Sequence, residues 1–381
     1  MTMAAERMPA PAQTDWVAIA HELAPVFAAR AAAHDAGDLF VSENYADLKQ
    51  GRFFSAGVPA ELGGGNATHA ELCDVLRTLA RACGSTALAL SMHTHLVATA
   101  AWRWRHEEAP VEAMLRRVAA EEMLLISSGG SDWLSGSGTA EKVDGGYRIA
   151  ARKIFSSGCP AGDALVTSAV LDDPAAGPTV LHFPVALTAP GVRILDTWHT
   201  MGMRGTGSHD ILLDGVFVPD AAINGRRPQG KWHPLFHAIT MLALPIIYAV
   251  YLGVAEAARD LAVREAARKR DDAAVQSLVG EMDTELTAAR LAHASMVHIA
   301  ATARPGPETT NAVAMARSLT GRAVIRTVEK AMEVVGGGSF YRSLGLERLF
   351  RDVQGARYHP LQEKVQIRYS GRLALGLDID G

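Results

Sequence analysis

The sequence predicts an α+β fold that is mainly helical, with its strands gathered in the middle of the chain. A helix-forming composition extends to about residue 122, and short segments of strand length, separated by Gly, Pro and Asp, follow to about residue 228. Helical spacing of apolar residues then returns and continues toward the end. This order excludes the alternating strand–helix pattern of a dinucleotide-binding domain. We therefore expect domains at 15–122, 123–228 and 229–381.

The first domain is predicted to be α-helical because it is rich in Ala, Leu, Glu and Arg and poor in β-branched residues. Within it, the segment 70–82 fits an amphipathic helix. In the middle domain we expect strands at 147–155, 164–171, 179–187, 192–195 and 211–218. The polar segment 225–231 contains Pro and Gly, and we expect it to be the hinge into the third domain.

The third domain is predicted to be a helical bundle. Apolar side chains recur at helical spacing in the segments 282–296 and 324–335. The apolar run 241–255 contains Pro245 and is shorter than the ~20 residues that a membrane span needs. We expect it to be a buried helix, and we expect no membrane association.

Charge and cysteine content argue against several classes of function. The 381 residues include 41 acidic and 37 basic side chains, a net charge of -4, without a long basic block, so no nucleic acid partner is expected. Cys73, Cys83 and Cys159 lack the C-x-x-C spacing of a zinc or redox site, so we expect reduced thiols, no metal and a cytoplasmic location. The chain contains no P-loop, and no G-x-G-x-x-G follows a predicted strand, which argues against a nicotinamide cofactor bound in the usual way.

The segment 127–158 carries the most informative motifs. Ser127 and Ser128 precede the run Gly-Gly-Ser-Asp at 129–132, and Lys-Ile-Phe-Ser-Ser-Gly follows at 153–158. These motifs resemble the middle domain of acyl-CoA dehydrogenases, where a Gly-Ser-Asp loop and an aromatic-x-Ser/Thr strand hold the flavin. Small hydroxyls and bare backbone N–H groups let a flat polar ring approach closely, although a Gly-Ser run alone is more typical of a surface loop. The resemblance implies the following flavin contacts: Ser127, Ser128, Ser131, Phe155 and Ser157.

Three further stretches resemble the same family in the same order. The segment 58–65 is similar to its Pro-Glu-x-Gly-Gly signature, 198–208 to the turn before the last strand of its β-domain, and 335–340 with Arg351-Asp352 to its Gly-Gly-x-Gly-Phe and Arg-Asp pair. The resemblance implies that Gly336 and Gly337 approach the flavin diphosphate of a neighbouring subunit; a helix C-cap is the alternative. It covers about residues 15–380. It implies the acyl-CoA dehydrogenase fold, with a β-barrel-like middle domain, a C-terminal four-helix bundle and a homotetramer.

The catalytic position departs from the family pattern. Medium-chain-type dehydrogenases place a catalytic Glu shortly after the Arg-Asp pair, and our alignment puts His359-Pro360 there. Other members carry this Glu on the first long helix of the bundle, where the corresponding place lies close to Ala243. Glu363, one turn beyond Pro360, is a candidate base, and an exposed structural Glu is the alternative.

A histidine at this position resembles the two-component flavin monooxygenases of the same family, which use reduced flavin and oxygen. Those enzymes pair the His with a Ser on the flavin side, which corresponds here to His359 and Ser157. A histidine suits such a role because its unperturbed pKa lies near 6.5. His93 and His95 fall in a helix expected to face the pocket, and at most one of them is expected to act because they point to different faces. His93 is the candidate that we include.

Three functions agree with the sequence, and a fold alone cannot choose among them. The first, which we predict, is α,β-dehydrogenation of an acyl-CoA thioester with FAD and an electron acceptor. The second is a monooxygenase that uses FMN or a diffusible reduced flavin from a flavin reductase, because the family's Arg-x-x-Phe-Gly segment is replaced by the shorter 266–272. The third is a catalytically silent flavin- or acyl-binding protein.

Overall fold

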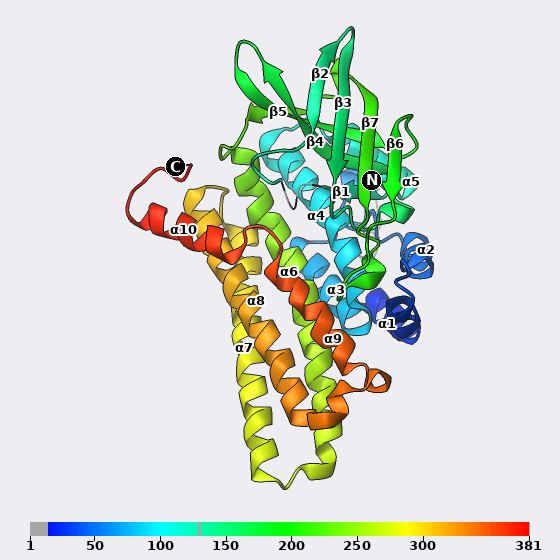
Figure 1. The fold of residues 1–381 in the computed structure, drawn as a ribbon, viewed down its shortest axis with the longest axis vertical. Coiled ribbons are helices and arrows are strands. Elements are labelled where there is room, and N and C mark those ends of the chain that lie inside the picture. The colour runs from blue at the N-terminus through cyan, green and yellow to red at the C-terminus, as the bar shows by residue number, and fades with distance from the viewer. Residues whose placement is uncertain (1–13, 129, 131, 381) are drawn as a thin grey trace, which may run out of the picture.

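The structure is a computed structural model that describes residues 14–128, 130 and 132–380. Helices come first, strands follow, and a second set of helices ends the chain, which confirms the predicted fold class (Figure 1). The N-terminal helices are α1 (Trp16–Ala36), α2 (Ser42–Gln50), α3 (His69–Ala82), α4 (Gly84–Glu107) and α5 (Glu112–Glu121). The C-terminal helices are α6 (Pro234–Ala266), α7 (Ala273–Thr302), α8 (Pro307–Val335), α9 (Leu346–Val353) and α10 (Glu363–Ala374).

The strands between the two helical regions form one sheet. They are β1 (Leu125–Ser127), β2 (Thr139–Val143), β3 (Gly146–Lys153), β4 (Ala164–Asp173), β5 (Gly177–Ala186), β6 (Val192–Leu195), β7 (Asp210–Pro219) and β8 (Gly225–Pro228). Their order is β6-β7-β3-β2-β4-β5-β8, and β1 pairs with β4 in parallel. Antiparallel pairing joins β3 to β7 and β4 to β5.

The predicted hinge at 225–231 is partly wrong, because its first four residues form β8. This strand pairs antiparallel with β5, where Arg227 lies opposite Val180. The Arg227 side chain is buried and donates to the backbone carbonyl oxygens of Trp133 and Leu134. Pairing with the distant strand β5 therefore determines the structure of this segment, although its Pro and Gly residues locally favour a turn.

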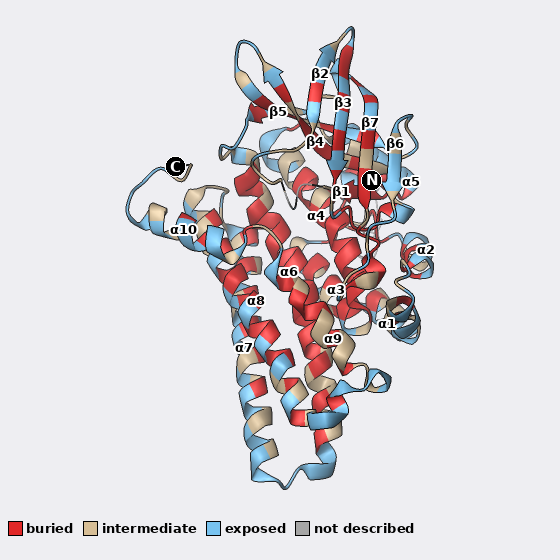
Figure 2. Ribbon diagram, in the orientation of Figure 1, coloured by how far each residue is buried: buried red, intermediate tan, exposed pale blue. Residues whose placement is uncertain are grey.

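Helix α6 is the central helix of the bundle and is buried along most of its length (Figure 2). It is long and apolar enough to cross a membrane, but 94% of its most apolar stretch is buried inside the protein. It packs against α3, α4, α7, α8 and α9. The expectation of a buried core helix at 241–255 is confirmed.

One continuous hydrophobic core joins all three regions of the chain. It includes Leu79 of α3, Phe183 of β5 and Val254 of α6. Helix α3 enters this core in a fixed register because Thr68 and Glu71 form a capping box at its N-terminus. The sheet, α4 and the bundle are therefore packed against one another through a shared core.

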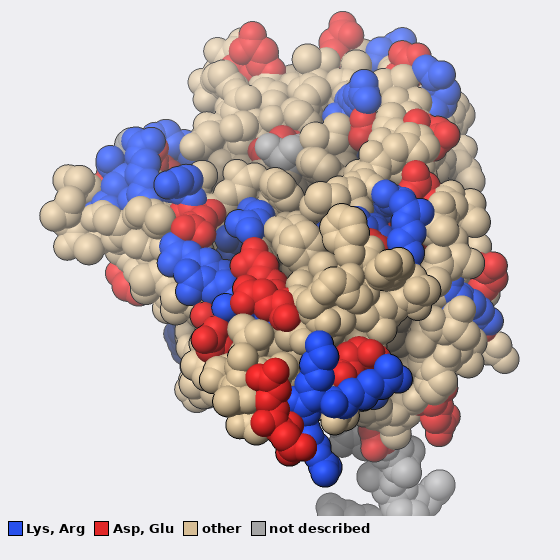
Figure 3. Space-filling view, turned by 60° about the horizontal axis from the view of Figure 1, so that its bottom comes forward, with Lys and Arg blue, Asp and Glu red and all other residues tan. Residues whose placement is uncertain are grey.

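Charges of both signs are present on the face shown in Figure 3. Lysines and arginines gather on the projection at its left edge, while acidic and basic side chains are interspersed over the centre. Ion pairs join neighbouring helices, such as Arg326 with Glu285 and Lys330 with Glu281. Exposed pairs of this kind contribute little to stability.

Candidate active site

An exposed aromatic pair lies beyond the end of strand β3. Phe155 has a φ of 57°, a conformation that bulky residues rarely adopt, and its side chain remains 51% exposed. Its ring meets that of Trp198 edge to face, with the ring centroids 6.0 Å apart. The exposed ring of Phe155 and the half-buried ring of Trp198 together offer an apolar platform for a flat ligand.

A chain of hydroxyl groups lies beside this platform. Ser157 Oγ is 2.7 Å from Ser208 Oγ, which is 2.6 Å from Thr206 Oγ1. Thr206 in turn donates to the backbone carbonyl of Met203 at 2.9 Å. All three hydroxyl side chains are buried, so each is held in a defined orientation. The predicted site residue Ser157 is thus fixed by the 198–208 turn that the sequence also singled out.

The loop between β1 and β2 is anchored by a buried lysine. Lys153 donates to Asp132 at 3.0 Å and to the Ser137 backbone carbonyl at 2.9 Å. Ser128 Oγ lies 2.7 Å from Thr167 Oγ1, and Ser127 is half-buried at the end of β1. The predicted contact Ser131 lies outside the described residues.

His359 belongs to a second group of polar side chains, contributed by the bundle. Its Nε2 is 2.6 Å from the hydroxyl of Tyr251 on α6, and its backbone carbonyl accepts a hydrogen bond from Arg317 of α8 at 2.6 Å. Burial, with smaller contributions from Arg317 and His95, lowers the pKa of His359 to about 3. The imidazole is therefore neutral at physiological pH.

The two histidines of α4 have different environments. His93 is fully engaged, because its Nδ1 accepts from the Leu125 backbone N–H at 2.9 Å and its Nε2 lies 2.8 Å from the Phe54 carbonyl. His95 is buried, its Nδ1 has no partner in the described part of the chain, and it is close enough to His359 to affect its charge state. Of the two, His95 is the one that affects the pKa of His359, whereas His93 connects α4 to β1.

Thr99, one helical turn beyond His95, has the same character. Its hydroxyl is buried and has no hydrogen-bond partner among the described residues. Residues four apart lie on the same face of a helix, so His95 and Thr99 form one polar strip on α4. Burial lowers the pKa of His95 to about 4, so this strip is uncharged.

Glu363, the candidate base, lies in the first turn of α10. It forms an ion pair with Arg322, with 3.1 Å between Oε2 and Nε, and this bond to Arg322 lowers the pKa of the carboxyl. Its side chain is 40% exposed. The geometry gives Glu363 a surface ion pair on α8, and no contact with His359 is formed.

The glycines Gly336 and Gly337 follow α8 and lie away from the Ser157 cluster in a single chain. Gly336 has a φ of 71° and ends the helix, in agreement with a C-cap. A Cβ added at either position would meet no atom within 4 Å. The helix C-cap therefore explains why residue 336 is a glycine. No contact among the described residues explains why residue 337 is also a glycine.

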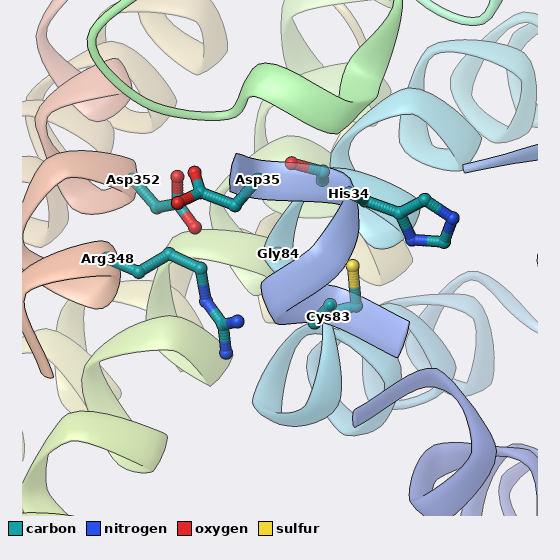
Figure 4. A pocket seen from close by; sticks show the side chains of 8 residues that line it. His34, Asp35, Cys83, Gly84, Arg348 and Asp352 are labelled. Atoms are coloured by element: carbon teal, nitrogen blue, oxygen red, sulfur yellow. The ribbon is translucent and has the colours of Figure 1, made fainter. Parts of the chain in front are cut away.

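A small cavity lies between α1, the start of α4 and α9 (Figure 4). Its volume is about 10 Å³, room for about one water molecule. The carboxyl groups of Asp35 and Asp352 lie beside one another there, while the ring of His34 points away from them. Burial raises the pKa of Asp352 to about 6, although the carboxyl accepts a hydrogen bond from the Met203 backbone N–H. The cavity is too small for a cofactor or a substrate.

Several side chains of these clusters were not predicted from the sequence: Trp198, Ser208, Tyr248, Tyr251 and Arg317. Tyr248 and Tyr251 carried a signal, because two hydroxyls three residues apart interrupt an otherwise apolar helix. Arg317 carried none, since a single arginine in a helix is ordinary composition. Only the fold shows that it is buried.

Models of the acyl-CoA dehydrogenase family match two parts of the chain. The N-terminal domain model matches residues 17–122, and the C-terminal domain model matches residues 241–359. A relative described as the putative acyl-CoA dehydrogenase YdbM of Bacillus subtilis is 30% identical over 91% of this chain and 93% of its own length. The chain belongs to the acyl-CoA dehydrogenase family.

Other relatives carry a different reaction in their names. The amino sugar nitrososynthase DnmZ of Streptomyces peucetius is 33% identical over 84% of this chain and 83% of its own. The solved structure of KijD3 in complex with FMN and dTDP-3-amino-2,3,6-trideoxy-4-keto-3-methyl-D-glucose has a TM-score of 0.89 and 28% identity. It covers 99% of this chain and 97% of that one.

Proposed function

We propose that this protein is a flavin-dependent monooxygenase that uses reduced flavin and dioxygen. One observation carries the proposal, which replaces our prediction of an acyl thioester dehydrogenase. The position of the dehydrogenase base is held by His359, a neutral imidazole bonded to Tyr251. Removal of an α-proton needs an available base, but Glu363 is paired with Arg322 and Asp352 faces a closed cavity.

The residues of the first cluster fit a flavin. The exposed ring of Phe155 and the half-buried Trp198 suit the apolar faces of an isoalloxazine, and Ser157 and Ser128 would offer hydroxyl groups to its polar edge. Reduced flavin would supply two electrons, so that one oxygen atom of dioxygen reaches the substrate and the other leaves as water. FMN and FAD both fit this cluster, and the names of the relatives favour FMN.

His359, His95 and Thr99 are the residues that we assign to the substrate. His359 presents a neutral ring held by Tyr251, and the strip of His95 and Thr99 adds two polar groups to which the described residues offer no partner. An apolar acyl chain against these groups would leave them buried and unsatisfied, at a cost of about 1–3 kcal/mol each. A substrate with hydroxyl or amino groups would satisfy them.

The substrate class that follows is a polar amine, such as an amino sugar attached to a nucleotide. The nitrososynthase relatives support this choice by name, and the uncharged polar strip supports it by chemistry. We further propose a separate flavin reductase as the source of reduced flavin. A homotetramer is also proposed, in which Gly337 faces the cofactor of a neighbouring copy, and the cytoplasm is the proposed location.

The function is tested with the full-length protein, FMN, NADH and a flavin reductase under air. We expect a dTDP-3-amino sugar to gain oxygen, with ¹⁸O from ¹⁸O₂ appearing in the product by mass spectrometry. Separately, acyl-CoA thioesters of several chain lengths are added without oxygen to protein loaded with oxidised FAD or FMN. If a thioester bleaches the flavin and no amine is oxygenated, the proposal is wrong and the protein is an acyl thioester dehydrogenase.

A further inference from the structure

His359 is surrounded by a clamp of buried side chains from two helices. Tyr248 of α6 donates to the Ala356 backbone carbonyl at 2.6 Å, and Arg317 of α8 donates to the His359 carbonyl at 2.6 Å. Arg317 also reaches the Ala356 carbonyl at 3.3 Å. These contacts fix the backbone of the turn that carries His359, and so they restrict the position of its ring.

The Tyr251 hydroxyl completes the clamp by contacting the ring itself. Tyr251 is fully buried, and His359 Nε2, at 2.6 Å, is the hydrogen-bond partner that the described residues give its hydroxyl. A glycine at 355 keeps this contact free, because a Cβ there would lie 2.7 Å from the Tyr251 oxygen. Gly355 therefore leaves room for the Tyr251 hydroxyl beside Nε2 of His359.

The direction of this hydrogen bond follows from burial. If Tyr251 accepted a proton from Nε2, its own hydroxyl hydrogen would be left buried without an acceptor, at a cost of about 1–3 kcal/mol. The bond is satisfied on both sides when Tyr251 donates and Nε2 accepts. In a neutral imidazole with Nε2 as acceptor, the proton is on Nδ1.

We propose that Tyr251 is a positioning residue that holds His359 as its Nδ1–H tautomer and so makes the ring a hydrogen-bond donor toward the site. No described residue bonds to Nδ1, and His359 is partly exposed, so this nitrogen is open to a ligand. Tyr248 lies edge to face with the ring, Arg317 and His95 act on its charge, and none of the three is an acid that would favour an imidazolium. The catalytic part of this inference rests on the proposed function, but the tautomer does not.

The consequence is a fixed polarity for the site. His359 offers an N–H and cannot take a proton on the same nitrogen, so it suits an electron-rich oxygen or nitrogen atom of the ligand. His95, which is near enough to affect the pKa of His359, has an Nδ1 without a partner among the described residues. A ligand group that accepts from His359 and donates to His95 would satisfy both, which describes a hydroxyl or an amine.

The test is ¹⁵N NMR of the full-length protein labelled at histidine, with the His359 signals assigned by their loss in His359→Gln. We expect the proton on Nδ1, with no change between pH 6 and 8. A proton on Nε2, or titration in this range, would overturn the proposal. Tyr251→Phe is expected to produce a mixture of tautomers, and the matched control Tyr248→Phe to keep Nδ1–H.

Activity provides the second readout. Tyr251→Phe is expected to lower kcat by about 10-fold, because only part of the protein then presents the Nδ1–H donor, and Tyr248→Phe is expected to keep kcat within about 2-fold of the parent. An Nδ1–H signal in Tyr251→Phe equal to that of the parent would also contradict the positioning role. If the proton is on Nδ1 but no amine is oxygenated, the proposed function fails and the positioning role of Tyr251 stands. If an amine is oxygenated but the proton is on Nε2, the proposed function stands and the positioning role fails.

Discussion

The backbone N–H of Met203 donates to the carboxyl of Asp352 at 2.5 Å, and this bond ties the turn that orients Ser208 and Ser157 to helix α9. Asp352 is only 3% exposed, and burial raises its pKa to about 6. Arg348, Arg351 and Asp35 surround it but do not remove the cost of its charge. The contact between the sheet and the bundle therefore depends on a carboxyl that is unfavourably charged at neutral pH.

Asp352→Asn is expected to stabilise the protein at pH 8. The folded pKa of about 6 lies above the unfolded value of about 3.9, so the folded state binds the proton more tightly, and this contribution to stability is lost as pH rises from about 4 to 6. Asn keeps an acceptor for Met203 without the charge, and the gain should reach about 3 kcal/mol. Urea unfolding of the variant and the parent at pH 5 and pH 8 measures this gain in the free energy of unfolding. A gain that is larger at pH 5 than at pH 8 would contradict the raised pKa of Asp352.

Thr99→Val is expected to raise stability and impair substrate use at once. Its hydroxyl is buried without a partner among the described residues, so an isosteric apolar group should add about 1 kcal/mol. The same change should raise KM for an amine substrate by about 10-fold, because one hydrogen bond is lost. The control is Thr94→Val on the same helix, where the hydroxyl donates to the Leu90 carbonyl at 2.9 Å and no stabilisation is expected. Urea unfolding measures the change in stability, and steady-state kinetics measures the change in KM. If Thr99→Val is stabilised but its KM is unchanged, Thr99 does not contact the substrate.

His359→Ala is expected to uncouple oxygen consumption from product formation. Without the fixed N–H of His359, reduced flavin should lose its electrons to oxygen as hydrogen peroxide, and the ratio of peroxide to product should rise by about 10-fold. Glu363→Gln is the matched control, since Glu363 is half-exposed and paired with Arg322. Its coupling should remain within about 2-fold of the parent, with a stability change of about 0–1 kcal/mol. Turnover abolished by Glu363→Gln would instead identify Glu363 as the base.

Gly337→Ala is expected to weaken flavin binding without destabilising the single chain. An added Cβ has no neighbour within 4 Å, so the loss must come from a ligand or a second copy that occupies this space. FMN affinity, followed by fluorescence quenching, should fall by at least about 5-fold. Gly280→Ala on the exposed side of α7 also adds a Cβ in open space and should leave the affinity unchanged. Equal affinities for both variants would show that Gly337 lies outside the cofactor site.

Much of the fold could be predicted from the sequence because it depends on local patterns. The order of helices and strands follows from composition and from turn residues, and α6 follows from its apolar run. Strand β8 was missed because its partner, β5, lies more than forty residues away and the local signal was Pro and Gly. Pairing between distant strands leaves little trace in a single segment.

The site was predicted less completely, for a similar reason. Phe155 and Ser157 belong to a motif, and the structure places both of them together with Trp198 and Ser208. His93 and His95 cannot be distinguished by spacing, because only the packing of α4 decides which side chain bonds to β1 and which affects the pKa of His359. Arg317 and Tyr251 become recognisable only when α6 and α8 meet the turn that carries His359.

The most direct test of the central claim is the visible spectrum of flavin-loaded protein, recorded without oxygen as acyl-CoA thioesters of several chain lengths are added. The account predicts no bleaching, because neither His359 nor Glu363 is free to take an α-proton. The same sample, reduced and exposed to air with an amino sugar nucleotide, should then yield an oxygenated amine. Bleaching by any thioester at a catalytic rate would contradict the account and identify a dehydrogenase.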